Sequence, residues 1–299
     1  MLRRILFTPA GRVRTPWRLL LFLVVFGVLL FAAHGALDRL DPPPVGHGLL
    51  WSSLATLAAA LVAGMALLGW VDGRPPGALG YAWTWQTPRE IGGGVAIGAV
   101  SLVLVVGAFV LAGLVSFVGD EGSAGSYART LLLDFGVLAV AAAAEEALFR
   151  GYPFQALVQG TGPVIATVLL SALFAAAHLP NPNLGAFALL NIFLAGVLLS
   201  VAYLRTRSLW LPTAVHLGWN WAMASPLDLP VSGLEVFDTP LYEPSVTGPD
   251  WITGGAFGPE GGIGASIAFL LALAAVRWLP LWHEPLELRA RGPLVDDRS

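Results

Sequence analysis

The most constraining feature of this chain is a series of long apolar segments separated by polar loops. A bilayer core of about 30 Å needs roughly 20 helical residues to cross it, so segments of this kind are expected to form membrane-spanning helices. Eight segments qualify, namely residues 19–37, 49–70, 91–118, 131–158, 162–179, 185–204, 209–224 and 263–281. The predicted fold class is therefore an all-α, polytopic transmembrane helix bundle of about eight spans. We expect residues 1–299 to form a single integral membrane domain.

Composition supports this interpretation and excludes several function classes. Hydrophobic residues make up 56% of the chain and charged residues only 12%, whereas an ordinary soluble domain carries about 25% charged residues. Cysteine is absent, which excludes a thiol nucleophile, a disulfide framework and a thiolate metal site. The sequence has no basic patch of the kind that binds nucleic acid, so the expected partners are the lipid bilayer and membrane-embedded molecules. Nothing in the sequence predicts an oligomeric state.

The orientation of the spans follows from the basic residues, all sixteen of which are arginine. If the N-terminus is cytoplasmic, alternate loops place all of them inside except Arg39 and Arg129, which is a strong positive-inside bias. The sequence thus predicts a multi-pass protein of the plasma membrane with a cytoplasmic N-terminus (1–18) and a cytoplasmic tail (283–299). The first apolar run exceeds the roughly 7 to 15 residues of a signal peptide, so we interpret it as a retained anchor.

The long loop at 225–262 should lie outside the cell. It is rich in proline and glycine, and it carries several acidic residues. Such composition is typical of a connection with little regular structure.

Ionisable residues inside apolar spans are costly, so each is a functional candidate. The fourth span contains Glu145, Glu146 and Arg150. Glu146 and Arg150 are four residues apart on one helix face, which favours an ion pair that holds the Glu146 side chain in place. Glu145 points about 100° away and lacks that partner. An unpaired carboxylate in apolar surroundings takes up a proton readily, as a general base must. Alternatively, the three residues could simply hold helices together.

The fifth span ends at His178, four residues after Phe174, and the following Leu-Pro-Asn-Pro-Asn must stop the helix. A helical hairpin that turns at 160–162 would bring His178 to the same depth as Glu145, because each lies 16 or 17 residues from Thr161. A histidine at such a position is otherwise more often structural than catalytic.

The seventh span places His216 and Asn220 on one helix face, with Pro212 in the first turn. Two neutral hydrogen-bonding groups on one stripe could hold an oxyanion, share a metal or join helices. Two further polar residues lie in spans. Asp134 could line the same face as Glu145 or be an interfacial anion, and Asn191 is expected to hydrogen-bond to a neighbouring helix.

Together these pieces resemble the signature of the CAAX-protease and bacteriocin-processing (Abi) family of intramembrane endopeptidases. The resemblance covers about residues 131–224, the expected catalytic helices, and rests on the motifs Glu145-Glu146-x-x-x-Arg150, Phe174-x-x-x-His178 and His216-x-x-x-Asn220. It implies hydrolysis of a peptide bond inside the membrane. Glu145 and His178 would activate water, His216 and Asn220 would hold the developing oxyanion, and the Glu146–Arg150 pair would support them.

Metal dependence stays open at this point. Members of the family are often described as metalloproteases, and Glu145, His178 and His216 could hold Zn²⁺ with an open position for water. The same groups suffice for general-base chemistry, so we favour a mechanism with no obligatory cofactor. The zincin pattern His-Glu-x-x-His is absent.

The resemblance leaves the substrate as a membrane-embedded or lipidated protein or peptide. Two other function classes fit the residues. A non-catalytic membrane scaffold or bacteriocin-immunity protein would keep the fold but tolerate replacement of Glu145 and His178. A proton-coupled transporter could also use a buried carboxylate and histidine, although the chain lacks the repeated halves with paired broken helices that such carriers have.

Overall fold

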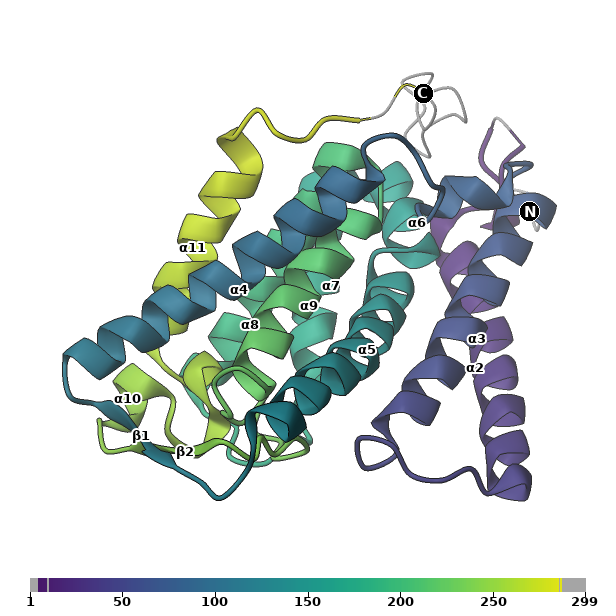
Figure 1. Cartoon of the computed structure of the whole chain (residues 1–299). Coiled ribbons are helices and arrows are strands. Elements are labelled where there is room, and N and C mark those ends of the chain that lie inside the picture. Colours follow the sequence, from purple (N-terminus) through teal and green to yellow (C-terminus); the bar gives the residue numbers. More distant parts are fainter. Residues whose placement is uncertain (1–4, 10, 285, 287–299) are drawn as a thin grey trace.

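The chain folds into a bundle of long helices, capped at one end by short elements (Figure 1). The computed structural model describes residues 5–9, 11–284 and 286. The main helices are α2 (Thr15–Leu40), α3 (Leu49–Trp70), α4 (Thr87–Leu111), α5 (Ala124–Phe149), α6 (Tyr152–Thr161), α7 (Pro163–Ala177), α8 (Ala186–Thr206), α9 (Trp210–Ala224) and α11 (Ile263–Trp278). Each of the eight predicted spans overlaps at least one of them, which confirms the predicted all-α fold class.

The helices present the apolar surface expected of a membrane protein. Four of them, α2, α3, α4 and α8, are long and apolar enough to cross a bilayer, and α7 and α11 are apolar but shorter. Bulky apolar side chains point outward along the bundle, such as Phe31 (83% exposed) and Leu271 (67% exposed). Exposed apolar surface on this scale is stable only against lipid or a partner.

Helix α9 lies near the centre of the bundle, directly against α4. A Cβ atom added to Gly98 of α4 would lie 2.2 Å from the carbonyl oxygen of Val215, and one added to Gly218 would lie 2.3 Å from that of Val95. The two backbones therefore touch, as small residues allow in membrane helix pairs. This contact fixes the depth and rotation of α9, which carries His216 and Asn220.

The third predicted span is too long. Helix α4 ends at Leu111 rather than at 118, because Gly113 adopts a left-handed φ of +72°, and the amides of Gly113 and Leu114 donate to the carbonyl oxygens of Val110 and Phe109, respectively. This is a glycine-based helix stop. The chain then forms strand β1 (Val115–Gly119), whose β-branched and aromatic residues favour extended structure.

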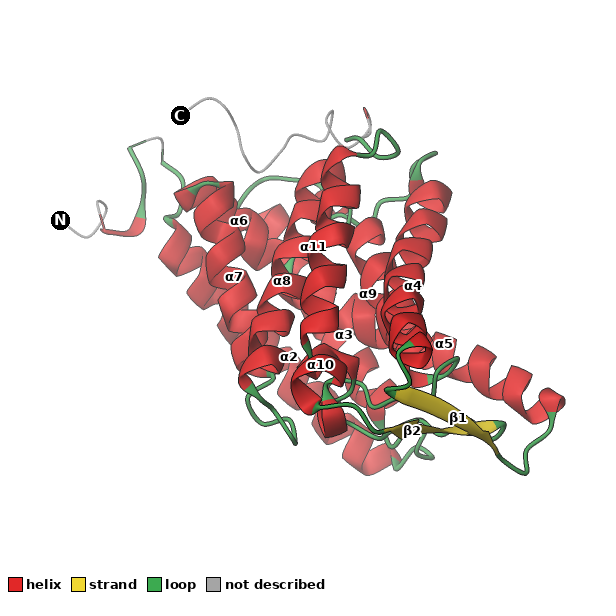
Figure 2. Cartoon of the chain, turned by 90° about the vertical axis from the view of Figure 1, so that its left-hand side faces the viewer, coloured by secondary structure: helices red, strands yellow, loops and turns green. Residues whose placement is uncertain are grey.

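The external loop is more ordered than the sequence predicted. Strand β2 (Tyr242–Val246) lies within it and pairs antiparallel with β1, so that Val115 faces Val246. The loop also contains α10 (Asp250–Thr253) and the 3-10 turns η2 (Gly255–Phe257) and η3 (Pro259–Gly261). Figure 2 shows these elements together at one end of the bundle. The expectation of little regular structure at 225–262 was therefore wrong.

The fourth predicted span is two helices rather than one. Helix α5 ends at Phe149, and α6 begins at Tyr152 after a bend at Gly151, whose ψ of -131° is not helical. Pro153 has no N–H to continue the hydrogen-bond ladder, and a Cβ on Gly151 would lie 2.2 Å from the carbonyl oxygen of Ala147. The turn expected at 160–162 does occur, with Gly162 at a φ of +86° between α6 and α7.

The predicted cytoplasmic segment 1–18 also needs correction at its end. Helix α2 already begins at Thr15, and the Arg18 side chain is only 3% exposed. Its guanidinium forms an ion pair with Asp72 at 2.7 Å and donates a hydrogen bond to the hydroxyl of Tyr152 at 3.1 Å. This ion pair ties α2 to the end of α3. Most of the predicted tail 283–299 lies outside the described residues.

Candidate active site

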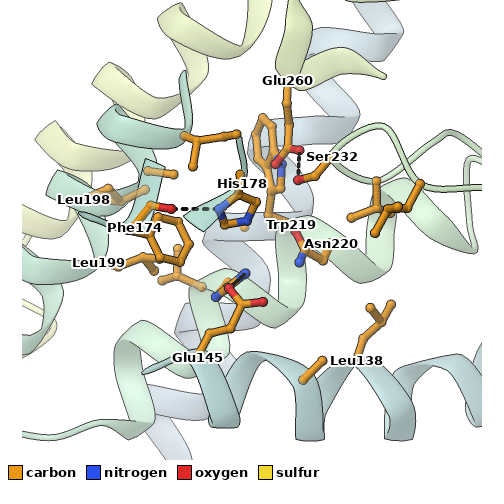
Figure 3. Close-up of a pocket in the computed structure, with 18 of the residues that line it drawn as sticks. Leu138, Glu145, Phe174, His178, Leu198, Leu199, Trp219, Asn220, Ser232 and Glu260 are labelled. Carbon is orange, nitrogen blue, oxygen red and sulfur yellow. Dashed lines mark hydrogen bonds and ion pairs between the residues drawn. The ribbon is translucent and has the colours of Figure 1, made fainter. Parts of the chain in front are cut away.

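Helices α4, α5, α7, α8, α9 and α11 and the 225–262 loop line a cavity of about 320 Å³. Four predicted site residues, Glu145, His178, His216 and Asn220, line it together. Figure 3 shows the Glu145 side chain on one side of this cavity and the His178 ring across it. The other two predicted residues, Glu146 and Arg150, are fully buried and do not line the cavity.

The buried pair holds one of the histidines in place. The Glu146 Oε1 atom accepts a hydrogen bond from Arg150 Nη1 at 3.1 Å and lies 3.0 Å from Nδ1 of His216. Arg150 also donates through Nη2 to the carbonyl oxygen of Gly196 at 3.0 Å, and its guanidinium lies 4.5 Å from the centre of the Phe174 ring. The guanidinium therefore fixes Glu146, and Glu146 in turn fixes the orientation of His216.

Glu145 faces the opposite edge of the same imidazole. Its Oε2 atom lies 3.8 Å from Nε2 of His216, and the Glu145 side chain is 38% exposed to the cavity. That oxygen has no hydrogen-bond partner among the described residues. Of the two adjacent glutamates, Glu145 is thus the one whose side chain lines the cavity.

His178 is oriented by its own helix. As the residue that follows α7, it donates through Nδ1 to the carbonyl oxygen of Phe174 at 2.8 Å, which fixes the orientation of its ring. The Phe174 ring lies against both site histidines, 4.9 Å from His178 and 6.1 Å from His216 between ring centres. Within the described chain, the carboxylate of Glu145 has an ion-pair partner in His216 and none in His178. The two predicted water-activating groups share the cavity without direct contact.

Asn220 lies one helical turn beyond His216 on α9 and is half-buried in the cavity wall. Its neighbour Trp219 donates through Nε1 to Oε1 of Glu260 at 3.0 Å. Glu260 and Ser232 also line the cavity, and sequence reasoning assigned them no role. Both belong to the 225–262 loop, which carries no recognisable motif and was expected to be irregular.

The two other polar residues noted in the spans lie away from the cavity lining. Asp134 accepts a hydrogen bond from Ser225 at 2.8 Å and lines a separate, shallower pocket. Asn191 donates to the carbonyl oxygens of Glu260 and Gly262 and accepts from Ser266 of α11. Asn191 thus bonds to a neighbouring helix, as predicted, and also anchors the end of the loop.

The histidines and Glu145 do not form a three-ligand metal site as their side chains lie. In the described part of the chain, one group of three potential ligands has donor atoms that all lie within 4.8 Å of one another, and it consists of Asp228, Asp238 and Glu243. That group belongs to the 225–262 loop. The donor atoms of Glu145, His178 and His216 are more widely spread, so Zn²⁺ coordination by these three would require side-chain rotation.

The structure thus places carboxylate, histidine and amide groups around one cavity of an all-α membrane bundle. Comparison with protein families gives a match over the same part of the chain. Residues 127–222 match the family described as Type II CAAX prenyl endopeptidase Rce1-like. This match confirms the resemblance to the CAAX-protease and bacteriocin-processing family over nearly the segment that carries the three motifs. No curated protein matches the chain.

Proposed function

We propose that this protein is an intramembrane endopeptidase that hydrolyses a peptide bond in a membrane-embedded or lipidated protein or peptide. The observation that carries the proposal is the convergence of Glu145, His178, His216 and Asn220 on one cavity within the matched domain. The apolar surroundings exclude bulk water from these groups, which strengthens their electrostatic effect on a reacting peptide.

In the proposed reaction, a water molecule in the cavity is activated by Glu145 and His178. Nε2 of His178 accepts a hydrogen bond from the water and orients it, and the Glu145 carboxylate takes a proton as the water oxygen attacks the peptide carbonyl. The protonated Glu145 then gives its proton to the amide nitrogen as the C–N bond breaks. The products are a new carboxyl end and a new amino end.

His216 and Asn220 would stabilise the tetrahedral oxyanion. In this role Nδ1 of His216 donates to Glu146, and Nε2–H, on the Glu145 side of the ring, donates to the oxyanion. The Asn220 amide would supply a second donor from one helical turn away. Glu146 and Arg150, buried behind the cavity, position His216 without touching the substrate.

We propose further that no metal is obligatory. If Zn²⁺ does bind, Glu145, His178 and His216 are the residues that would hold it, and it would polarise the peptide carbonyl. Their spacing does not fit a preformed metal site, so the mechanism above relies on the side chains alone.

The proposed location is the plasma membrane, with the N-terminus and C-terminus in the cytoplasm. The described arginines support this orientation. Arg74, Arg89, Arg205 and Arg277 lie at the ends of helices opposite the 225–262 loop, whereas Arg39 and Arg129 lie at the loop end.

A direct test uses the purified full-length protein with a library of transmembrane and lipidated peptides, read by mass spectrometry. We expect new peptide ends with the wild-type protein and none with Glu145→Gln, which keeps the side-chain shape but removes the base. Identical products from both proteins, or none from either, would contradict the proposal and favour a scaffold role.

A further inference from the structure

Glu260 is a buried carboxylate in the wall of the catalytic cavity. It lies in the 3-10 turn η3, its side chain is only 6% exposed, and it lines the same cavity as Glu145 and Asn220. Figure 3 shows Glu260 and Glu145 on opposite sides of the cavity, with Trp219, Asn220 and His178 between them. An extended peptide that passes the catalytic groups can therefore reach Glu260.

The position of this carboxylate is set from two directions. The Asn191 amide donates to the carbonyl oxygens of Glu260 and Gly262 at 2.7 and 2.8 Å, which holds the turn against α8. The side chain accepts one hydrogen bond on each oxygen, from Trp219 Nε1 at 3.0 Å and from Ser232 Oγ at 2.6 Å. These four hydrogen bonds fix both the backbone and the side chain of Glu260.

The charge of Glu260 is not balanced by the protein. Among the described residues, no arginine or histidine forms an ion pair with it, and both of its hydrogen-bond donors are neutral. A buried carboxylate with neutral partners alone is costly, whereas a cation beside it forms a strong charge-assisted hydrogen bond. Each carboxylate oxygen can accept a further hydrogen bond from a group in the cavity.

The end of the bundle that carries the 225–262 loop is strongly acidic. Leu49 at the start of α3 and the loop residues Leu234, Val236 and Phe237 line the cavity on that side. The described ionisable residues at this end include two arginines, Arg39 and Arg129, and the acidic residues Asp38, Asp41, Asp120, Glu121, Asp134, Asp228, Glu235, Asp238, Glu243, Asp250 and Glu260. Such a field attracts positively charged molecules to the cavity.

We propose that Glu260 is a specificity-determining residue that binds a positively charged group of the substrate, either a lysine or arginine side chain or a free amino terminus. This inference rests on the proposed peptidase function, because it gives that same site a substrate class. The apolar part of the peptide would occupy the cavity wall, and its cationic group would pair with Glu260 across the cavity from Glu145.

The test uses peptides of one fixed apolar sequence that differ only in charge. One series carries a single lysine at successive positions, a matched series carries glutamine there, and each is made with a free and with an acetylated amino terminus. With the wild-type protein, we expect kcat/KM for one lysine position, or for the free amino terminus, to exceed that of its neutral match by about 10-fold or more, as for one hydrogen bond to a charged group.

Glu260→Gln should reduce that ratio to near one, because the amide still accepts hydrogen bonds but carries no charge. Glu260→Asp keeps the charge and should retain a clear preference for the cationic peptide. Glu243→Gln is the matched control, since Glu243 is an exposed acidic residue of the same loop that does not line the cavity. Its ratio should equal that of the wild type.

Two results would overturn the inference. One is cleavage of the wild-type substrates with no preference for a cation. The other is equal loss for cationic and neutral peptides in Glu260→Gln together with a lower melting temperature, which indicates a purely structural role. Binding of the same peptides to Glu145→Gln separates this inference from the peptidase proposal. A cationic preference in binding supports the role of Glu260 even if no peptide is cleaved, and its absence counts against that role.

Discussion

Nδ1 of His216 lies 3.0 Å from Oε1 of Glu146, so the carboxylate that pairs with Arg150 also orients the histidine of the cavity. The adjacent Glu145 meets the other edge of the same ring at 3.8 Å. Two consecutive glutamates therefore have different surroundings, one fully buried and bonded, the other open to the cavity. Their different surroundings predict different consequences of substitution.

Glu145→Gln is expected to abolish turnover while leaving thermal stability close to that of the wild type, because it removes a base that has no cationic arginine partner. Glu146→Gln should lower stability as well as activity, since it leaves the fully buried Arg150 without its ion-pair partner. Breaking a buried pair in this way costs about 3 to 5 kcal/mol. Thermal melting of the two purified variants and turnover of one peptide would distinguish them, and an equal loss of stability in both would show that the roles are assigned wrongly.

The sequence predicted the helical segments well, and it predicted which polar residues share a helix face, because both depend on local patterns. Apolar length identifies spans, and i, i+4 spacing places Glu146 with Arg150 and His216 with Asn220 on shared helix faces. The helix break after Arg150 was not predicted, because Gly151 and Pro153 lie inside an otherwise apolar run. Pattern alone does not distinguish a kinked helix from two helices.

The contacts made by the external loop could not be predicted, because they join residues far apart in the chain. Trp219 and Glu260 are bonded across the cavity wall, and β1 finds its partner strand more than a hundred residues later. Such pairs carry no local periodicity. The spacing argument predicted the same depth for Glu145 and His178, and both line one cavity. The imidazole that pairs with Glu145 nevertheless belongs to His216, because helix rotation is not encoded in spacing.

His216→Ala and Asn220→Ala should each lower turnover by roughly 10²- to 10³-fold, the usual cost of removing one oxyanion donor. Single-turnover kinetics on one cleavable peptide would measure this loss, and peptide binding should change much less than kcat. Thr213→Ala on the same helix is a suitable comparison, since Thr213 bonds to Tyr81 and does not line the cavity. Losses confined to binding would argue against an oxyanion role.

Because the chain contains no cysteine, its membrane topology can be tested by introducing one cysteine at a time. Glu235→Cys in the external loop should react with a membrane-impermeant maleimide in intact cells, whereas Pro75→Cys after α3 should react only after the cells are opened. Both residues are exposed. Reporters fused after Ser299 and near Val246 should likewise indicate cytoplasm and exterior. Labelling of both cysteines from one side would contradict the proposed arrangement of spans.

The acidic loop should be more stable at mildly acidic pH. Burial raises the pKa of Asp228 above its ordinary value of 3.8, and the charges of Asp238 and Asp120 add to this. The pKa of Glu243 is raised from 4.5 by desolvation and by the same neighbouring acids. A carboxyl with a raised pKa binds protons more tightly in the folded state, so its stabilising contribution is fully present below the unfolded pKa and is lost as pH rises through the folded one.

Limited proteolysis of the loop between pH 5 and pH 8 should therefore show faster cleavage at the higher pH. The cleavage rates are first divided by the activity of the protease on an unfolded substrate at the same pH. Asp238→Asn should slow cleavage at pH 8 and flatten the profile, because it removes one repelling charge. Glu235→Gln, another exposed acidic residue of the loop outside this group, serves as the control. A profile for Asp238→Asn as steep as that of the wild type would rule out this source of pH dependence.

Removal of metal separates the two mechanisms that the site residues allow. If Glu145 and His178 act directly on water, a strong chelator should leave turnover unchanged, because no ion is needed to generate the nucleophile. If Zn²⁺ is the Lewis acid, chelation should stop turnover until metal is restored. The spread of the donor atoms of Glu145, His178 and His216 and the presence of Asn220, a better oxyanion donor than zinc ligand, favour the first outcome. Elemental analysis completes the test, since stoichiometric zinc in active protein that is lost together with activity in His216→Ala would establish the metal mechanism instead.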